Sequence, residues 1–469
     1  MLALPIALAV FAGAAPVPLR PVHTYSIVAR DPKTGELGVA VQSHWFSVGS
    51  GVPWAEAGVG AVATQSFIDP SYGPLGLSLM RAGRTAPEAL TALLAGDGGR
   101  DVRQVGMVDA KGNVATHTGK LCIPAAGGQS GKDYVVQANL MDKPTVWPAM
   151  ARAFEATSGD LAAPHRPVAT YSIVARDART GEMGVAVQSH WFSVGPVVPW
   201  AEAGVGAVAT QSFVNVAHGP NGLQLLRSGL SAPDALAALL AGDPGRDVRQ
   251  LGIVDAQGHV AAYTGAKCIV AAGDHVGDGY SCQANLMDKD TVWPAMAQAF
   301  EASAGQPLAE RLLAALQAAE AQGGDIRGRQ SAALLVVSGT STGRPWHDRL
   351  VDLRVEDDPA PLDELARLLR LRRAYDHMNA GDLALEHGDM DAAVQAYGAA
   401  QKLAPEVYEI AFWAGITLAG KGRLDEARPL LKQALMAYPR LAGLIPRLPA
   451  AGLLPDDPAL IEELSGLAP

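Results

Sequence analysis

The chain has 469 residues, of which 49% are hydrophobic and 18% charged, and this balance excludes an intrinsically disordered protein. Its net charge of −10 gives no broad basic surface, so nucleic acid is not an expected partner. Three cysteines are too few for a disulfide scaffold, and beyond the N-terminus no apolar run is long enough to span a bilayer.

The first fifteen residues resemble a secretory leader. MLALPIALAVFAGAA is apolar, and Ala12-Gly13-Ala14 offers a small-residue cleavage site. We therefore expect cleavage after Ala14 or Ala15 and export to the periplasm or the outside of the cell. No Lys or Arg precedes the apolar run, so an ordinary buried segment or a misplaced start codon is the alternative reading.

The following segment predicts three strands and occurs twice. TYSIVARD begins at Thr24 and again at Thr170, and GVAVQSHWFSVG and VPWAEAGVGAVATQS follow each time. Alternating and continuous apolar runs, separated by Thr-Gly turns, are typical of paired strands. The repeat continues without a gap to Thr157 in the first copy and Ser303 in the second. Recombination would produce this tandem, and so would an error in assembling the sequence.

Each copy continues with helices and a hairpin. GPNGLQLLRSGL and APDALAALLAGD have the apolar spacing of helices, DVRQLGIVDAQGHVAAYTG predicts a hairpin, and TVWPAMAQAFEAS begins another helix. This mixture of strands and helices predicts an α+β sandwich.

The two copies are unequal in length. Copy one is expected over residues 24–158 and, after a linker at 159–169, copy two over 170–357. Only copy two has the helix LAERLLAALQAAEAQ and the strands SAALLVV and DLRVED. Copy one should therefore expose a sheet edge and an apolar face, and we expect the copies to cover these by packing together as an internal pseudo-dimer.

Residues 362–465 predict an all-α domain. Gly388 and Gly422 are 34 residues apart, as are Pro405 and Pro439, and this is the period of tetratricopeptide repeats. Such repeats present a surface to a protein or peptide, and the alternative is a helical lid over the preceding domain.

TYSIVARD, GVAVQSHWFSVG, VPWAEAGVGAVATQS, GRDVRQLGIVDAQG, YSCQANLM and GRQSAALLVV together resemble the domain of unknown function 1028 family. The resemblance implies the αββα sandwich of the N-terminal-nucleophile (Ntn) hydrolases. It covers about residues 24–157 and 170–356.

That resemblance also implies a nucleophile at the first residue of a mature chain, where its own α-amine serves as the base. The matching positions are Thr170 and Thr24. Thr170 would act only after cleavage of the Ala169–Thr170 bond, because an amide nitrogen is no base. Thr24 would require loss of everything through His23, which is a poor signal-peptidase site. The alternative for both is an ordinary β-branched strand residue.

Other polar residues are expected to line the same cleft. They are Ser189, His190, Gln211, Ser212, Asn215, Asp177, Asp247 and Asn285. The histidine would be a general base or a neutral structural donor. No metal-ligand or phosphate-loop spacing occurs, so no cofactor is expected.

Cys268 and Cys282 could form a disulfide in an oxidising compartment or remain two buried thiols. The sequence thus predicts an exported hydrolase of a linear or cyclic amide. The alternative is a non-catalytic binding or scaffolding protein whose repeats recruit a protein or peptide.

Overall fold

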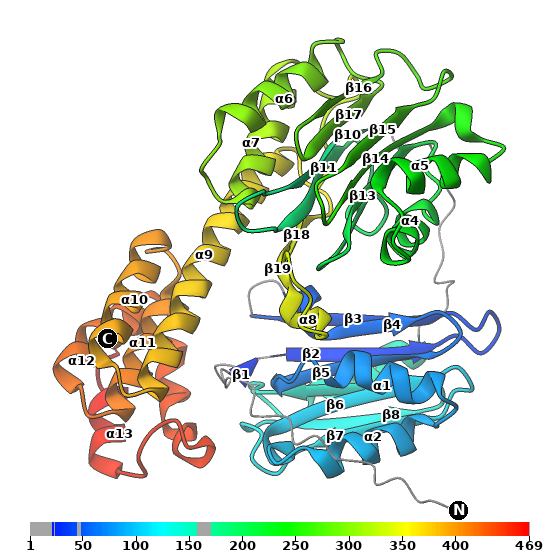
Figure 1. The fold of residues 1–469 in the computed structure, drawn as a ribbon. Helices are drawn as coiled ribbons and strands as arrows, with labels where there is room; N and C mark the ends of the chain where they lie inside the picture. Colours follow the sequence, from blue (N-terminus) through cyan, green and yellow to red (C-terminus); the bar gives the residue numbers. More distant parts are fainter. Residues whose placement is uncertain (1–20, 23, 45–47, 157–169, 469) are drawn as a thin grey trace, which may run out of the picture.

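The computed structural model describes residues 21–22, 24–44, 48–156 and 170–468, and it has three parts (Figure 1). Unit one (residues 21–156) and unit two (170–357) are α/β sandwiches, and the helical domain (361–468) follows them. The expected leader and linker lie outside the described residues. Among the residues described, no helix is both long and apolar enough to cross a membrane.

Unit two contains two antiparallel sheets. The first has six strands in the order β16-β17-β10-β11-β18-β19, and the second has four in the order β12-β13-β14-β15. The first sheet comprises β10 (Thr170–Arg176), β11 (Met183–Ser189), β16 (Gly273–Gly277), β17 (Tyr280–Asn285), β18 (Ser331–Val337) and β19 (Arg349–Val355). The second comprises β12 (Pro199–Glu202), β13 (Gly206–Ser212), β14 (Arg249–Asp255) and β15 (Val260–Thr264).

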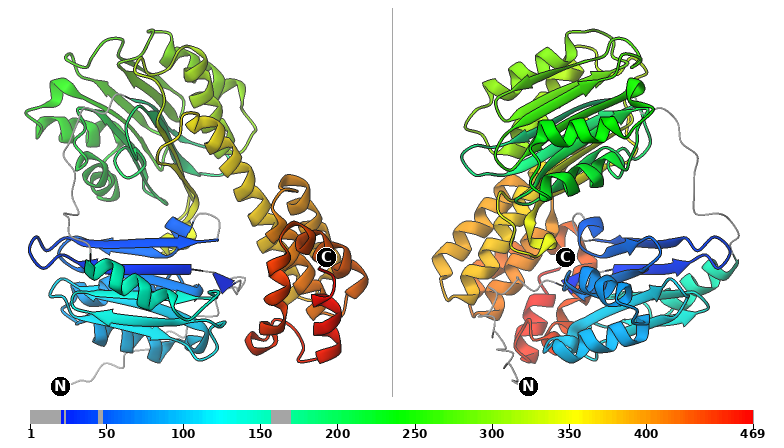
Figure 2. Two further views of the ribbon diagram at one scale, coloured as in Figure 1. Left: turned by 180° about the vertical axis from the view of Figure 1, so that it is seen from behind. Right: turned by 45° about the vertical axis from the view of Figure 1, so that its right-hand side comes forward.

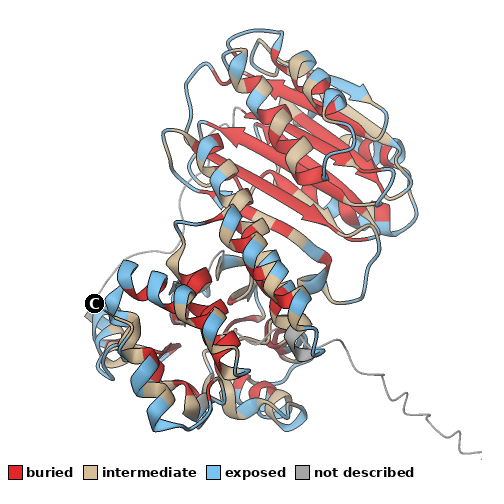
Figure 3. Cartoon of the chain, turned by 90° about the vertical axis from the view of Figure 1, so that its left-hand side faces the viewer, coloured by how far each residue is buried: buried red, intermediate tan, exposed pale blue. Residues whose placement is uncertain are grey.

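Helices cover the outer face of each sheet, which gives four layers (Figure 1). Phe300 of α6 (Val292–Ala302) and Leu312 of α7 (Leu308–Ala321) pack on the six-stranded sheet. Leu223 of α4 (His218–Arg227) and Leu236 of α5 (Ala232–Ala241) pack on the four-stranded sheet. The short helix α8 (Pro345–Asp348) precedes β19. Most of the six-stranded sheet is buried (Figure 3).

Local sequence explains the ends of these elements. Gly181 adopts a φ of 76° in the turn between β10 and β11, a conformation that glycine reaches without strain. The hydroxyl of Ser231 accepts a hydrogen bond from the Asp234 amide and caps α5, whose first turn contains Pro233.

Unit one repeats this arrangement without the last helix and strands. One sheet has the order β3-β2-β9-β8, and the other has the order β1-β5-β6-β7, with β4 also paired to β5. Its strands are β1 (Pro21–Val22), β2 (Thr24–Arg30), β3 (Leu37–Ser43), β4 (Pro53–Glu56), β5 (Gly60–Phe67), β6 (Arg103–Asp109), β7 (Val114–Thr118), β8 (Gly127–Gly131) and β9 (Tyr134–Asn139). Its helices are α1 (Tyr72–Arg81), α2 (Ala86–Gly96) and α3 (Val146–Ala156).

The expected open edge is present at β3. Among the described strands, β3 pairs only with β2, whereas its counterpart β11 lies between β10 and β18. The outer face is open as well: Tyr25 is 36% exposed, and its counterpart Tyr171 is fully buried under α7.

The helical domain consists of α9 (Pro361–Glu386), α10 (Met390–Leu403), α11 (Tyr408–Gly420), α12 (Leu424–Ala437), three short 3₁₀ segments over 439–451, and α13 (Pro458–Ser465). The long helix α9 joins two cores. Leu365 and Leu369 pack with unit two, and Ala374 and Met378 pack with the repeats.

The structure does not support the expected pairing of the two units. Unit one instead lies beside the helical domain (Figure 2). It contributes Phe67, Ile123 and Leu140 to the core of that domain. Arg447 donates to the Pro124 carbonyl at 3.2 Å, and Arg440 lies 3.2 Å from the Asp142 carboxylate. The helical domain therefore covers one end of unit one.

Candidate functional site

Thr170 is the first residue of the central strand β10. It lies opposite Ser189 on one neighbouring strand and Asn285 on the other. Its side chain is fully buried and faces the second sheet, and its Oγ1 donates a hydrogen bond to Ser189 Oγ at 3.1 Å. Three of the predicted site residues are therefore brought together at one end of the sheet.

Amide side chains from both sheets hold the Thr170 carbonyl: Gln211 comes from β13 of the opposite sheet and Asn285 from the neighbouring strand β17. Gln211 Nε2 donates to this oxygen at 3.1 Å, and Asn285 Nδ2 donates to it at 3.4 Å. Both amides also donate to Gln250 Oε1, at 2.8 and 2.9 Å. Because these groups are buried, each donor needs an acceptor inside the protein.

Sequence reasoning missed half of this network. Gln250, Gln283 and Ser172 belong to it: Ser172 Oγ donates to Gln211 Oε1 at 2.6 Å, and Gln283 Nε2 donates to Ser172 Oγ at 2.8 Å. Strand alternation could have found them, because Ser172 is two residues after Thr170 and Gln283 is two before Asn285. We call Gln211, Gln250, Gln283 and Asn285 the amide network.

Unit one contains the same arrangement around Thr24. Its Oγ1 donates to Ser43 Oγ at 3.0 Å, and Gln65 Nε2 donates to its carbonyl at 3.1 Å. Gln65 Nε2 also donates to Gln104 Oε1 at 2.7 Å, as does Asn139 Nδ2 at 3.0 Å.

The remaining predicted residues do not join Thr170. Asp177 was wrongly expected to converge with it, because β10 separates the two by its whole length, about 20 Å at 3.3 Å per residue. Its carboxylate accepts from the amides of Arg179 and Thr180 and closes the turn after the strand. The His190 side chain is exposed, and its backbone amide donates to Asp325 at 3.1 Å.

Ser212, Asn215 and Asp247 also serve other contacts. Ser212 ends β13 opposite Arg249 with a φ of 69°. Asn215 Oδ1 accepts from the Ala217 amide at the start of α4. Asp247 lies 3.2 Å from Lys267 at the surface.

An ion-pair cluster lies beside each network, and the sequence reasoning did not identify it. In unit two, Asp243 accepts from Arg249 Nε at 2.7 Å and contacts His218 Nε2 at 2.8 Å. The hydrogen bond from Arg249 holds the pKa of the Asp243 carboxyl well below its usual range, against the opposing effect of burial.

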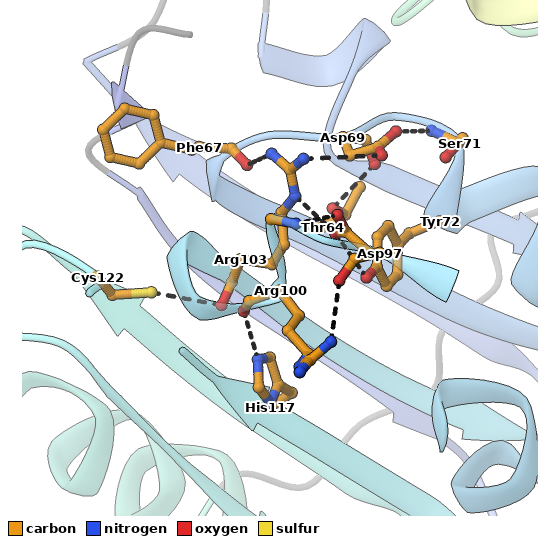
Figure 4. Close-up of polar contacts among 11 residues, drawn as sticks. Thr64, Phe67, Asp69, Ser71, Tyr72, Asp97, Arg100, Arg103, His117 and Cys122 are labelled. Carbon is orange, nitrogen blue, oxygen red and sulfur yellow. Dashed lines mark hydrogen bonds and ion pairs between the residues drawn. The ribbon is translucent and has the colours of Figure 1, made fainter. Parts of the chain in front are cut away.

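In unit one, the corresponding contacts are those of Asp97 with Arg103 and Tyr72, at 2.9 and 3.0 Å (Figure 4). Arg103 also donates to the Phe67 carbonyl at 2.7 Å. The cluster therefore fixes the end of β5, where Phe67 packs against the helical domain.

Of the two alternatives for Cys268 and Cys282, the disulfide is wrong, since all three cysteines are free thiols. Cys282 lies on the face of β17 that packs under the helices, among the residues around Tyr280 and Phe300. The Cys268 thiol donates to the Arg249 carbonyl of the other sheet at 3.3 Å. The two side chains therefore lie in different layers. Burial raises the pKa of both thiols.

A cavity of about 620 Å³ lies between unit one and the helical domain. The rings of His44, Tyr408 and Tyr438 stack in its wall, with centroids 5.7 and 5.2 Å apart. Glu409 is buried beside them and accepts hydrogen bonds from Tyr375 and Trp413. Aromatic rings and charged side chains of both signs therefore line this cavity.

A family of unknown function, DUF1028, matches residues 24–165 and 170–365, and a tetratricopeptide repeat family matches residues 378–442. A crystal structure of a Silicibacter pomeroyi protein, described with the DUF1028 family, is 32% identical to this chain. It covers 46% of this chain and 92% of its own, with a TM-score of 0.39. No curated protein matches the chain.

Proposed function

The chain belongs to the DUF1028 family, and from this premise we propose that unit two is an Ntn-type amide hydrolase with Thr170 as its nucleophile. One observation carries the proposal: Thr170 is the first residue of a central strand in a four-layered unit, with its hydroxyl bonded to Ser189 and its carbonyl held by Gln211 and Asn285. This is a fixed position for a terminal nucleophile.

In the uncleaved chain the Thr170 nitrogen is an amide and accepts no proton. Addition of water across the Ala169–Thr170 bond would free an α-amine, whose ordinary pKa is about 7.7–8.0. That amine takes the Oγ1 proton while Oγ1 attacks the carbonyl carbon of the substrate amide. The C–N bond breaks, and the leaving amine receives the proton from the α-ammonium. Water then attacks the carbonyl carbon of the ester, and the α-amine takes a proton from that water. The resulting α-ammonium returns the proton to Oγ1 as the carboxylic acid leaves.

The experiment is to compare cleaved and uncleaved protein on a panel of acyl and peptide anilides. Hydrolysis should follow the appearance of a Thr170 N-terminus, measured by intact mass, and Thr170→Ala should abolish it. Thr24→Ala is the matched control and should retain activity. Hydrolysis by uncleaved chains at the same rate, or by Thr170→Ala, contradicts the mechanism.

We propose a second function, supported by the tetratricopeptide match and the cavity beside Tyr408 and Tyr438: the helical domain binds a protein or peptide partner. A photo-crosslinking phenylalanine analogue at Tyr438 should capture one specific partner in the native host. The same analogue at Met436, which is exposed and lies outside the cavity wall, should capture none. Equal capture from both positions contradicts a specific site.

We also propose export, on the basis of the apolar run before Ala12-Gly13-Ala14. N-terminal sequencing of protein from the native host should then begin at Ala15 or Pro16. Recovery of Met1 from the mature protein contradicts export by this leader.

A further inference from the structure

The end of unit two that carries Thr170 exposes a group of large apolar side chains. Phe213 follows the last residue of β13 and is 38% exposed, and Ile269 is 39% exposed. Val270 and Ile326 are exposed as well. These four are among the six large apolar side chains that are exposed in the described part of unit two. Exposed apolar side chains that gather at one place on a surface indicate a contact with another molecule.

Hydrogen bonds connect the segments that carry these side chains. Arg249 donates to the Phe213 carbonyl, and its own carbonyl accepts from the thiol of the residue before Ile269. The Ile269 carbonyl accepts from the Leu286 amide at 2.9 Å, and the Leu286 carbonyl accepts from the Ile326 amide at 3.3 Å. The set that we call the apolar end of unit two consists of Phe213, Ile269, Val270, Leu286 and Ile326.

Unit one has the same residue types at three of these positions, and there they are covered. Phe67, Ile123 and Leu140 correspond to the phenylalanine, the first isoleucine and the leucine of the apolar end. Phe67 is only 4% exposed and Ile123 only 2%, because both belong to the core that unit one shares with the helical domain. One surface therefore occurs twice in the chain, covered in unit one and open in unit two.

The cover over unit one shows which chemistry fits this surface. Leu444, Ile445 and Leu448 lie in and between the 3₁₀ segments of the helical domain and belong to the shared core. They are at most 7% exposed. A short helical stretch that presents aliphatic side chains is therefore complementary to the phenylalanine, isoleucine and leucine of each unit.

One charged contact of this cover also has a counterpart in unit two. Arg440 lies 3.2 Å from Asp142 of unit one, and both side chains are 67% exposed. Asp288 occupies the corresponding position in unit two, and its side chain is 44% exposed beside Lys289. Exposed ion pairs contribute little energy, so the apolar contact supplies the strength, and a basic residue sets the orientation.

The helical domain of the same chain is not available to unit two, because its aliphatic residues are buried against unit one. We propose that the apolar end of unit two binds a protein partner through a short helical segment that carries Leu or Ile side chains and a basic residue. Gln211 and Asn285, which hold the Thr170 carbonyl, directly precede two segments of this surface. The partner thus covers the Thr170 end as the helical domain covers the Thr24 end. The inference does not depend on the proposed hydrolase activity.

The test uses a fluorescently labelled synthetic peptide that copies residues 438–453, the stretch that covers unit one. Fluorescence anisotropy should show saturable binding of this peptide to the full chain. A peptide with Leu444→Ser, Ile445→Ser and Leu448→Ser should bind about tenfold more weakly, because it lacks the apolar contact. Arg440→Glu in the peptide should weaken binding by only about threefold, as expected of an exposed charge.

Variants of the full chain locate the site. Phe213→Ser and Ile269→Ser should each weaken peptide binding by about tenfold. Val276→Ser is the matched control: Val276 is 49% exposed in the same unit, and its partner Ser281 lies about 13 Å along β17 from Asn285, at 3.3 Å per residue. All three changed side chains are exposed, so each variant should keep the circular dichroism spectrum of the parent.

Four results would overturn the proposal. They are no binding of the parent peptide, equal binding of the parent and serine peptides, equal binding by Phe213→Ser and Val276→Ser, and self-association through this surface. Light scattering tests the last one, since a second copy of the chain is the other occupant to consider. We expect Phe213→Ser to leave the molar mass of the chain unchanged at every concentration. A dimer that Phe213→Ser dissociates would assign the surface to a second copy instead.

Discussion

At the scale of single residues, buried amides connect the two sheets of each unit. Gln250 accepts from Gln211 and Asn285 and donates to Thr264, Gly273 and Ala284. The polar positions could be read from strand parity, since an inward threonine implies an inward residue two places on. The hydrogen-bond partners of these residues could not be predicted, because the bonds join strands that are distant in sequence.

Replacing Gln250 by Leu should lower the free energy of unfolding of unit two by about 3 kcal/mol, because several buried groups lose their partner at once. Urea denaturation followed by hydrogen exchange of unit-two peptides measures this loss. Gln224→Leu, on the exposed face of α4, is the control and should change stability by less than about 0.5 kcal/mol. A neutral effect of Gln250→Leu would mean that water satisfies the network.

Acid should weaken unit two through Asp243. Its pKa is lowered in the folded state, mainly by Arg249, so its contribution to stability is fully present at neutral pH. That contribution falls progressively once the pH drops below the unfolded value of about 3.9. Asp243→Asn should therefore be less stable than the parent at pH 7, and the difference should shrink as the pH falls from about 4. A difference that is constant with pH contradicts this linkage.

At the scale of elements, helix α4 approaches β12 closely because Gly219 has no side chain. A Cβ at Gly219 would lie 2.3 Å from the Trp200 ring, and Gly73 faces Trp54 in the same way at 2.2 Å. Sequence periodicity predicted the helix, but not which glycine lies against the tryptophan. The error over Asp177 is of the same kind: the strand was predicted correctly, and the polar residue at its far end was assigned to the wrong end of the sheet.

Gly219→Ala should destabilise unit two by about 2 kcal/mol, because α4 must move away from Trp200. Gly398→Ala is the matched control. Gly398 lies in α10, is exposed, and has open space around it, so alanine there should stabilise the helix by about 0.5–1 kcal/mol. Thermal unfolding of both variants measures these changes in stability. A Gly219→Ala variant as stable as the parent would show that α4 and Trp200 move apart at little cost.

At the scale of the whole molecule, corresponding ends of the two units are covered by different segments of the chain. In unit two, the backbone of the segment 323–328 bonds to Leu286 and Asp288. In unit one, which lacks that segment, Tyr408 and Arg440 of the helical domain contact His44 and Asp142. The unequal copies and the repeats could be predicted from the sequence. The docking could not, because it depends on a surface formed by residues distant in the chain.

Phe67→Asp should separate unit one from the helical domain, since Phe67 is 4% exposed and belongs to the shared core. Small-angle scattering should show a larger radius of gyration. Phe213→Asp changes the counterpart in unit two, which is 38% exposed, and should leave the radius unchanged. An unchanged radius in Phe67→Asp, with unit one folded, contradicts the importance of this contact.

The shared core of unit one and the helical domain also imposes an order on biosynthesis. Phe67, Ile123 and Leu140 leave the ribosome long before Leu444, Ile445 and Leu448, which join the same core. At 5–20 residues per second, the intervening chain takes on the order of tens of seconds to be made. During that interval the nascent protein displays an apolar surface that chaperones recognise. The first unit to be synthesised is therefore the last to have this end covered.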